Sequence, residues 1–177
     1  SKANLSGANL WGANLVSADL GGAKLGSADL GSSILKGANL SSAKLNNANL
    51  ERAYLGEAKL TEANLTAANL TAANLTSAYL ERVKLERGKL EDADLEGATL
   101  EGATLVGANL SNADLQAVNF KGANLVYAAL INAFVKDANL TNANLGNANL
   151  KGANFRYTKL KNTNLKGATM PDGSINQ

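Results

Sequence analysis

A large apolar residue returns at every fifth position from Leu5 to Met170, without an insertion. This position is Leu in 30 of the 34 repeats, and the residue two places before it is Ala in 28. The residue directly before it is Asn in 16 repeats and Asp in 4. The two positions that follow vary, and Gly, Ser, Asn and Asp are frequent in the second of them. The chain is therefore one continuous series of five-residue repeats.

A period of five fits neither an α-helix nor a straight strand. Five residues advance about 500° on an α-helix, so successive leucines would point in all directions. On a straight strand they would alternate between the two faces. The pattern instead predicts a short extended segment, with Ala and Leu inside and Asn outside, followed by a turn at the variable positions. The chain then coils around its own leucines as a parallel solenoid, in which small alanines and large leucines share a narrow interior.

The repeats resemble those of the pentapeptide-repeat proteins. Residues 8–12 read Ala-Asn-Leu-Trp-Gly and residues 113–117 read Ala-Asp-Leu-Gln-Ala, and the likeness extends over residues 1–170. It implies an all-β fold, the right-handed parallel quadrilateral β-helix, with four repeats in each coil. The 34 repeats would make about eight and a half coils, a rod about 40 Å long at the usual strand spacing. Residues twenty apart are then expected to stack.

The pattern ends at Pro171, which a Pro-Asp-Gly turn follows. We expect a single β-helical domain over residues 1–170 and a C-terminal cap over residues 171–177, with Ile175 folded over the last leucines. This ending is similar to that of some cyanobacterial members of the family.

The composition argues against catalysis. The chain has no Cys and no His, which removes thiolate nucleophiles, imidazole bases and the usual zinc ligands. A solenoid without loops also lacks the concave pocket that an active site requires. We therefore expect no enzyme activity, no cofactor, no metal site and no small-molecule substrate.

Charge is unevenly distributed along the chain. The formal net charge is +2, and residues 81–117 hold eight acidic and four basic residues, whereas residues 118–177 hold two and seven. Stacking predicts ion pairs between Glu62 and Arg82 and between Glu101 and Lys121, and ladders of asparagine side chains. Most of these charges are expected to be solvated surface.

The best-known members of the family are quinolone-resistance proteins that mimic B-form DNA and bind gyrase. Such mimicry needs a continuous negative surface, and the pI of this chain is about 8.8, so a DNA mimic acting on DNA gyrase is a disfavoured alternative. Nucleic acid itself is not an expected partner, because the basic end lacks phosphate loops and a series of exposed aromatics. The uniform repeats also leave open an engineered or consensus origin.

Outward apolar residues are the candidate sites, because contiguous exposed apolar surface usually marks an interface. They form three groups: a main patch of Val106, Val126, Tyr127, Ile131 and Phe134; a second patch of Ile34 and Tyr54; and Trp11 with Val16, near the N-terminal end, for end-on contact. We predict a non-catalytic rigid scaffold that presents flat faces to a protein partner or to a second copy of itself, as a homo-oligomer.

The sequence contains no apolar run long enough to cross a bilayer and no signal-like segment at its start. We expect a cytoplasmic location. The periplasm or the thylakoid lumen is the alternative if a signal peptide was removed before Ser1.

Overall fold

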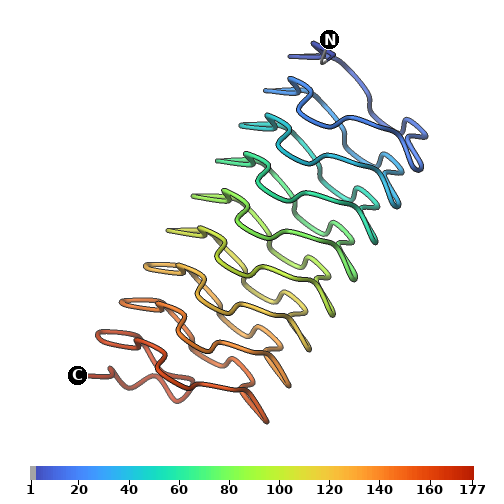
Figure 1. Ribbon diagram of the computed structural model, residues 1–177. Helices are drawn as coiled ribbons and strands as arrows, with labels where there is room; N and C mark the ends of the chain where they lie inside the picture. Colours follow the sequence, from blue (N-terminus) through green and yellow to red (C-terminus); the bar gives the residue numbers. More distant parts are fainter. Residues whose placement is uncertain (1–2) are drawn as a thin grey trace.

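The computed structural model describes residues 3–177, which wind into a quadrilateral β-helix with the two ends of the chain at opposite ends of a rod (Figure 1). Parallel bridges join residues that lie twenty positions apart, such as Asn49 and Asn69. Four repeats therefore make one coil, and the expected right-handed fold is confirmed. Residues 1 and 2, which belong to the expected domain, lie outside the described residues.

Each repeat forms one side of a coil and the corner that follows. The backbone N–H of Asn74 donates to Ala53 in the preceding coil at 2.9 Å, and that of Leu75 donates to Asp94 in the following coil at 2.6 Å. The extended segment is so short that each strand is reduced to one bridged residue, the residue before the leucine. No helix occurs within residues 3–177, so these bridges are the regular structure of the described chain.

The corners are tight turns of one kind. Ala78 N–H donates to the carbonyl of Leu75 at 3.0 Å, which closes the turn, and the second corner residue has a positive φ at every corner from Gly7 to Gly167. This combination is typical of the type II turn. Glycine adopts it without strain, yet most of these positions carry other residues, among them Ala67 at φ 57°. The repeat imposes the left-handed conformation on them.

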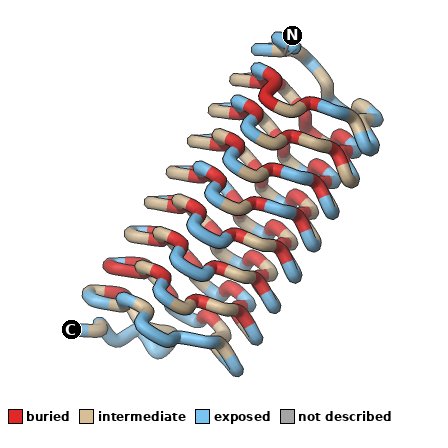
Figure 2. The backbone as a smooth tube through the Cα atoms, viewed as in Figure 1, coloured by how far each residue is buried: buried red, intermediate tan, exposed pale blue. Residues whose placement is uncertain are grey.

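The core consists of the alanines and leucines that the repeat places inside. From Ala23 to Leu150 these side chains are almost completely buried, and buried and exposed residues alternate around each coil (Figure 2). Phe120 takes the place of a leucine and is 0% exposed. The inward assignment of the fivefold apolar series is therefore confirmed for the middle of the rod.

The core is less well covered at both ends. Leu5, Leu10 and Leu15 are only half-buried at the first coil, and Leu160 is 41% exposed at the last. Apolar surface of the core thus reaches solvent at each end of the described rod.

The C-terminal segment folds back on the last coil. Ile175 forms an antiparallel bridge with Thr169, and the N–H of Gly167 donates to the carbonyl of Asn176 at 2.7 Å. The side chain of Ile175 is 59% exposed, so it does not cover the last leucines as expected. Pro171 lies beside them instead, because the backbone pairing turns Ile175 outward.

Candidate protein-interaction surface

The four sides of the coil present four outward columns, which we number as faces 1 to 4. Each column consists of the residues that directly precede the buried leucines and stack at intervals of twenty. Two corner residues separate each face from the next. The columns begin as follows: face 1 with Asn4 and Lys24, face 2 with Asn9 and Asp29, face 3 with Asn14 and Ile34, and face 4 with Asp19 and Asn39.

Asparagine is frequent in these columns because its side chain has two structural tasks. The Oδ1 atom of Asn49 accepts the N–H of Glu51 at the following corner at 3.2 Å, and its Nδ2 atom donates to Asp29 in the coil before at 2.8 Å. Asn69 repeats the arrangement and donates to Asn49 at 3.2 Å. Asn164 likewise donates to Asn144 at 2.9 Å on face 1. Columns of asparagine therefore serve the fold and leave few groups free for recognition.

Face 3 departs from this pattern. Ile34, Tyr54 and Phe134 occupy outward positions in its column and are 40%, 58% and 52% exposed. Ile34 and Tyr54 are directly bridged, as the second patch requires. Large apolar side chains in a column that elsewhere holds Asn or Asp weaken the local polar ladder, so they call for an explanation outside the fold itself.

The residues expected for end-on contact border the same face. Trp11 lies at the corner before face 3 and Val16 at the corner after it, and both are exposed. The indole of Trp11 lies against the next coil, because a β-carbon on Gly31 would be 2.9 Å from its Cδ1 atom. The structure thus brings Trp11 and Val16 to the side of the rod that carries Ile34 and Tyr54.

The main patch expected from the sequence turns around two corners. Val106 and Val126 stack at the corner between faces 1 and 2, where both are half-buried, and Tyr127 is exposed beside them. Ile131 is half-buried at the corner between faces 2 and 3, and Phe134 lies on face 3. These residues share neighbouring coils but not one flat face; of the five, Ile131 and Phe134 lie on or beside face 3.

The structure also shows exposed apolar residues that the sequence analysis did not select. Tyr79 projects from face 4, Tyr157 lies at the corner after face 3 with the guanidinium of Arg156 5.5 Å from its ring centre, and Leu160 is exposed at the end. Tyr79 and Tyr157 occupy outward positions of the repeat, so their exposure could have been predicted from the sequence. The exposure of Leu160 depends on the incomplete covering of the last coil.

A hollow of about 290 Å³ adjoins Tyr54 where a corner residue is glycine. The corner residues Lys36, Gly56 and Thr76 stack in successive coils, and Gly56 leaves a gap between the other two side chains. On the rim of this gap, the ammonium of Lys36 forms an ion pair with Glu57 at 3.4 Å. The hollow is therefore part of the surface at face 3.

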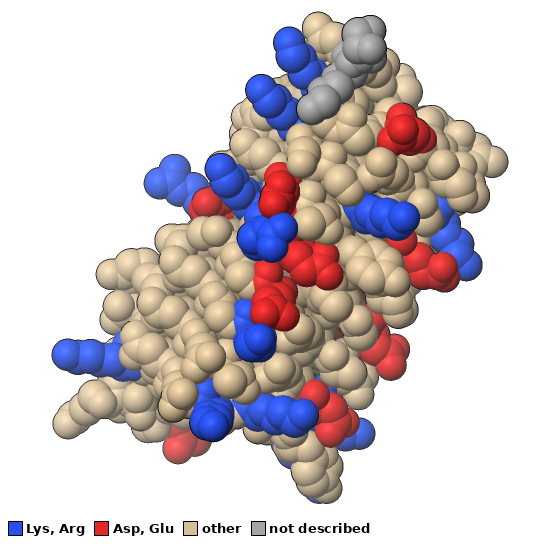
Figure 3. Space-filling view, in the orientation of Figure 1, with Lys and Arg blue, Asp and Glu red and all other residues tan. Residues whose placement is uncertain are grey.

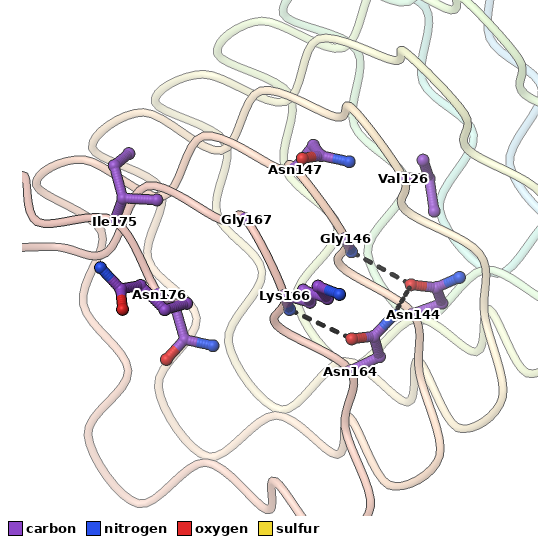
Figure 4. Close-up of a pocket in the computed structure, with 10 residues that line it drawn as sticks. Val126, Asn144, Gly146, Asn147, Asn164, Lys166, Gly167, Ile175 and Asn176 are labelled. Atoms are coloured by element: carbon purple, nitrogen blue, oxygen red, sulfur yellow. Dashed lines mark hydrogen bonds between the residues drawn. The ribbon is translucent and has the colours of Figure 1, made fainter.

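A second hollow, of about 390 Å³, lies at the corner between faces 1 and 2 near the C-terminal end (Figure 4). Here Gly146 leaves a gap between the corner residues Val126 in the coil before and Lys166 in the coil after. Ile175 of the folded-back segment lies at the side of this gap. Most of the residues that line it carry amide side chains or are glycines, Val126 and Ile175 add large apolar groups, and Lys166 is its one charged residue.

The expected ion pairs are confirmed. The Nη2 atom of Arg82 is 2.8 Å from Oε1 of Glu62, and the Nζ atom of Lys121 is 3.1 Å from Oε1 of Glu101. All four side chains are about half exposed or more, so each pair contributes about 0 to 1 kcal/mol to stability. Charged residues are otherwise spread over the rod, with wide uncharged areas between them on the side seen in Figure 3.

Two carboxylates have a lowered pKa: Glu81, and the exposed Asp172, whose carboxylate accepts hydrogen bonds from the hydroxyl and the backbone N–H of Ser174. Partial burial of Glu81 raises the pKa of its carboxyl group, but the backbone N–H of Glu81 and the hydroxyls of Thr99 and Thr61 lower it by more. Both hydroxyls donate to this carboxylate, at 2.8 and 2.9 Å. The pKa of Glu81 is therefore below its ordinary value. The hydroxyls of Thr99 and Thr61 thus stabilise the ionised form of Glu81.

Within residues 3–177 there is no group of three or more acidic side chains arranged to hold a metal ion. The described part of the chain also contains no apolar helix of membrane-spanning length.

Comparisons with known proteins agree with the fold. The family described as "Pentapeptide repeat region" matches residues 93–170, and the family described as "Pentapeptide repeats (8 copies)" matches residues 1–31, 33–71 and 48–87. A comparison with curated protein sequences gave no significant match.

Among solved structures, the chain is similar to HetL of the cyanobacterium Nostoc sp. strain PCC 7120, described as a pentapeptide repeat protein involved in the regulation of heterocyst differentiation. The identity is 32%, the match covers 99% of this chain and 92% of HetL, and the TM-score is 0.68. The pentapeptide repeat protein Rfr23 from the cyanobacterium Cyanothece 51142 is 34% identical over 53% of this chain and 64% of Rfr23, with a TM-score of 0.50.

QnrB1, a plasmid-mediated fluoroquinolone resistance protein, is 17% identical over 98% of this chain and 84% of its own, with a TM-score of 0.53. At that identity the likeness concerns the fold alone. The family matches span most of the chain, and HetL is similar over nearly its whole length. The chain therefore belongs to the pentapeptide repeat proteins.

Proposed function

We propose that this protein is a non-catalytic scaffold that binds a protein partner through face 3 and the corners beside it. One observation carries the proposal: Ile34, Tyr54 and Phe134 point outward from a single column and each is at least 40% exposed. Exposed apolar groups on a rigid surface favour association, and aromatic side chains are frequent where binding energy is concentrated. Trp11 and Val16 extend this surface at its N-terminal end.

The geometry of the coil supports a binding role over a chemical one. The backbone of each middle coil is hydrogen-bonded to its neighbours, so the faces form a stiff support that changes little on binding. Val126 and Tyr127 provide a smaller surface at the corner between faces 1 and 2. A partner bound to face 3 contacts this surface only if it also extends across face 2. HetL, described as involved in regulation, supports a regulatory role that acts through binding.

The test compares two tyrosines at equivalent positions of the repeat. Tyr54 lies on face 3 and Tyr79 on face 4, and both are exposed. Affinity capture from the organism that encodes the protein, with wild-type, Tyr54→Ala/Phe134→Ala and Tyr79→Ala baits, should yield a protein that is lost only with the face 3 variant. Equal capture by all three baits would refute the assignment of face 3.

Self-association is measured in the same series. Light scattering after size-exclusion chromatography gives the mass of each variant in solution. If the wild-type protein is a dimer and Tyr54→Ala/Phe134→Ala is a monomer, the occupant of face 3 is a second copy of the chain. Unchanged far-UV circular dichroism of the variants shows that the coil itself remains intact.

A further inference from the structure

The electrostatics of face 3 indicate what kind of partner it suits. Its middle coils contribute residues 71–77, 91–97 and 111–117, counting the corners on both sides, and these segments contain no Lys or Arg. They contain five acidic residues: Glu91, Asp92, Asp94, Glu96 and Asp114. We call these five residues the acidic band. It lies between Tyr54 and Phe134 in the same column.

The carboxylates of the acidic band are not neutralised by the protein. Salt bridges elsewhere join Glu57, Glu62 and Glu101 to lysine or arginine, but within residues 3–177 none involves a member of the band. Asp94 and Asp114 face each other across a direct bridge, which places like charges in adjacent coils. Such an arrangement costs stability at the surface, and a cationic partner would relieve that cost.

The hydrogen bonds of Asp94 and Asp114 leave their charge available, whereas in Glu91 the Oε2 atom is buried and the Oε1 atom accepts the side-chain amide of Asn109 at 2.6 Å. The Oδ1 atom of Asp94 accepts the N–H of Glu96, and the Oδ1 atom of Asp114 accepts the N–H of Gln116, both at 3.0 Å. These donors are neutral and cap the corners without removing negative charge. Glu96 itself is exposed.

The backbone of face 3 excludes recognition by strand addition. Asp94 N–H donates to Ala73 in the coil before, and Leu95 N–H donates to Asp114 in the coil after. The bridging amides along the face are occupied in this way, so a partner must be recognised through side chains. A helix satisfies its own backbone and presents side chains to a flat surface.

The spacing agrees with such a helix. Tyr54 and Phe134 are four coils apart, which corresponds to about 19 Å at the spacing of adjacent strands. A helix covers that length in about 13 residues. Its apolar residues at each end would contact Tyr54 and Phe134, and basic residues between them would lie over the acidic band.

From these observations, and resting on the proposed function, we infer that face 3 binds a basic amphipathic helix of a partner protein along the axis of the rod. The hollow beside Tyr54 receives one of the apolar side chains of this helix. Electrostatic attraction then fixes the register and accelerates association, while the aromatic contacts supply the affinity.

The experiment uses a defined probe. A fluorescent stapled helix of about 20 residues carries two leucines about 14 residues apart and three lysines between them on the same side. A matched peptide has glutamate in place of the lysines. Fluorescence anisotropy with the whole protein should show saturable binding of the lysine peptide alone, weakened about tenfold between 0.1 and 0.5 M salt because of screening.

Charge-neutralising variants locate the contact. Glu96→Gln/Asp114→Asn should weaken binding of the lysine peptide about fivefold to tenfold. The matched control, Glu86→Gln/Glu101→Gln, removes two charges from corners that do not border face 3 and should change the affinity less than about twofold. All four substitutions preserve side-chain size, so we expect both double variants to fold.

The outcomes separate this inference from the proposed function. Binding of both peptides, absence of saturable binding up to about 1 mM, or equal effects of the two double variants overturns the basic helix. If Tyr54→Ala/Phe134→Ala still abolishes capture of a partner in that case, face 3 is an interaction surface for a partner of different chemistry. If the lysine peptide binds as expected but capture is unaffected by the face 3 variant, the scaffold assignment fails instead.

Discussion

The indole of Trp11 lies over Gly31, one coil further along the rod. A β-carbon on Gly31 would approach Trp11 Cδ1 to 2.9 Å, so this contact depends on the absence of a side chain at that corner. Gly31 is buried although it occupies an outward corner position, because the tryptophan covers it. Trp11, which the sequence analysis assigned to end-on contact, therefore rests on the side of the rod, next to face 3.

This contact predicts a spectroscopic effect of Gly31→Ala. The added methyl group should displace the indole from its contact with the next coil and shift the fluorescence emission of Trp11, the chain's one tryptophan, to longer wavelength. Gly21→Ala is the matched control, because Gly21 also lies between an Asp in its own repeat and an Asn in the next coil but has no indole nearby. Equal emission spectra of the two variants would contradict the contact.

The inward position of the leucines predicts a contrast between neighbours. Leu75 is 1% exposed, and Leu75→Ala should lower the free energy of unfolding by about 2 to 5 kcal/mol, because it removes buried methyl groups and leaves a cavity. Thr76 lies at the corner, where its hydroxyl donates to Asp94 at 3.1 Å, and Thr76→Ala should cost less than about 1 kcal/mol. Urea denaturation measures both, and comparable losses would argue against the assignment.

Backbone strain at the corners predicts opposite effects of exchanging Ala and Gly. Ala67 and Gly107 are stacked at the same corner of the rod, two coils apart, with φ of 57° and 65°. Ala67→Gly should stabilise the protein by up to about 1 kcal/mol, because glycine adopts this conformation without strain. Gly107→Ala should destabilise it by about 1 kcal/mol, although the new methyl group meets no neighbour closer than 3.9 Å. The midpoints of urea unfolding report the sign of each change.

The lowered pKa of Glu81 predicts a pH dependence of stability. A carboxyl group with a lower pKa in the folded state stabilises the fold above its unfolded pKa of about 4.3, and this contribution disappears as the pH falls through the folded value. The free energy of unfolding should therefore fall more steeply below about pH 4 in the wild type than in Glu81→Gln. Thr61→Val/Thr99→Val, which removes two of the donors, should reduce the difference. If the free energy of unfolding has the same pH dependence below about pH 4 in both variants as in the wild type, the contacts of Glu81 do not contribute to stability.

The fivefold series made much of the fold predictable. The spacing of residues such as Leu70, Leu75 and Leu80 excluded both common backbones, so it required a chain that turns at each repeat. Four repeats per coil came from the resemblance to the family. Once that number is known, every outward residue has an assigned face, and pairs such as Glu62 with Arg82 follow by addition of twenty.

The candidate surfaces were less predictable, because residues that are neighbours in the sequence need not lie on one face. Val126 and Phe134 are close along the chain, yet face 2 and one further corner lie between them. Trp11 and Tyr54 are far apart along the chain, yet they lie on or beside face 3. The position of Ile175 was also misjudged, since antiparallel pairing with Thr169 turns its side chain outward.

The sequence by itself determined which residues are buried in the middle of the rod and where each corner falls, because a local period acts identically in every repeat. The tertiary structure decided how the indole of Trp11 packs, how the last residues pair, and how the apolar and acidic groups of face 3 lie in relation to one another. These depend on contacts between coils and on side-chain rotamers, which a five-residue period does not encode.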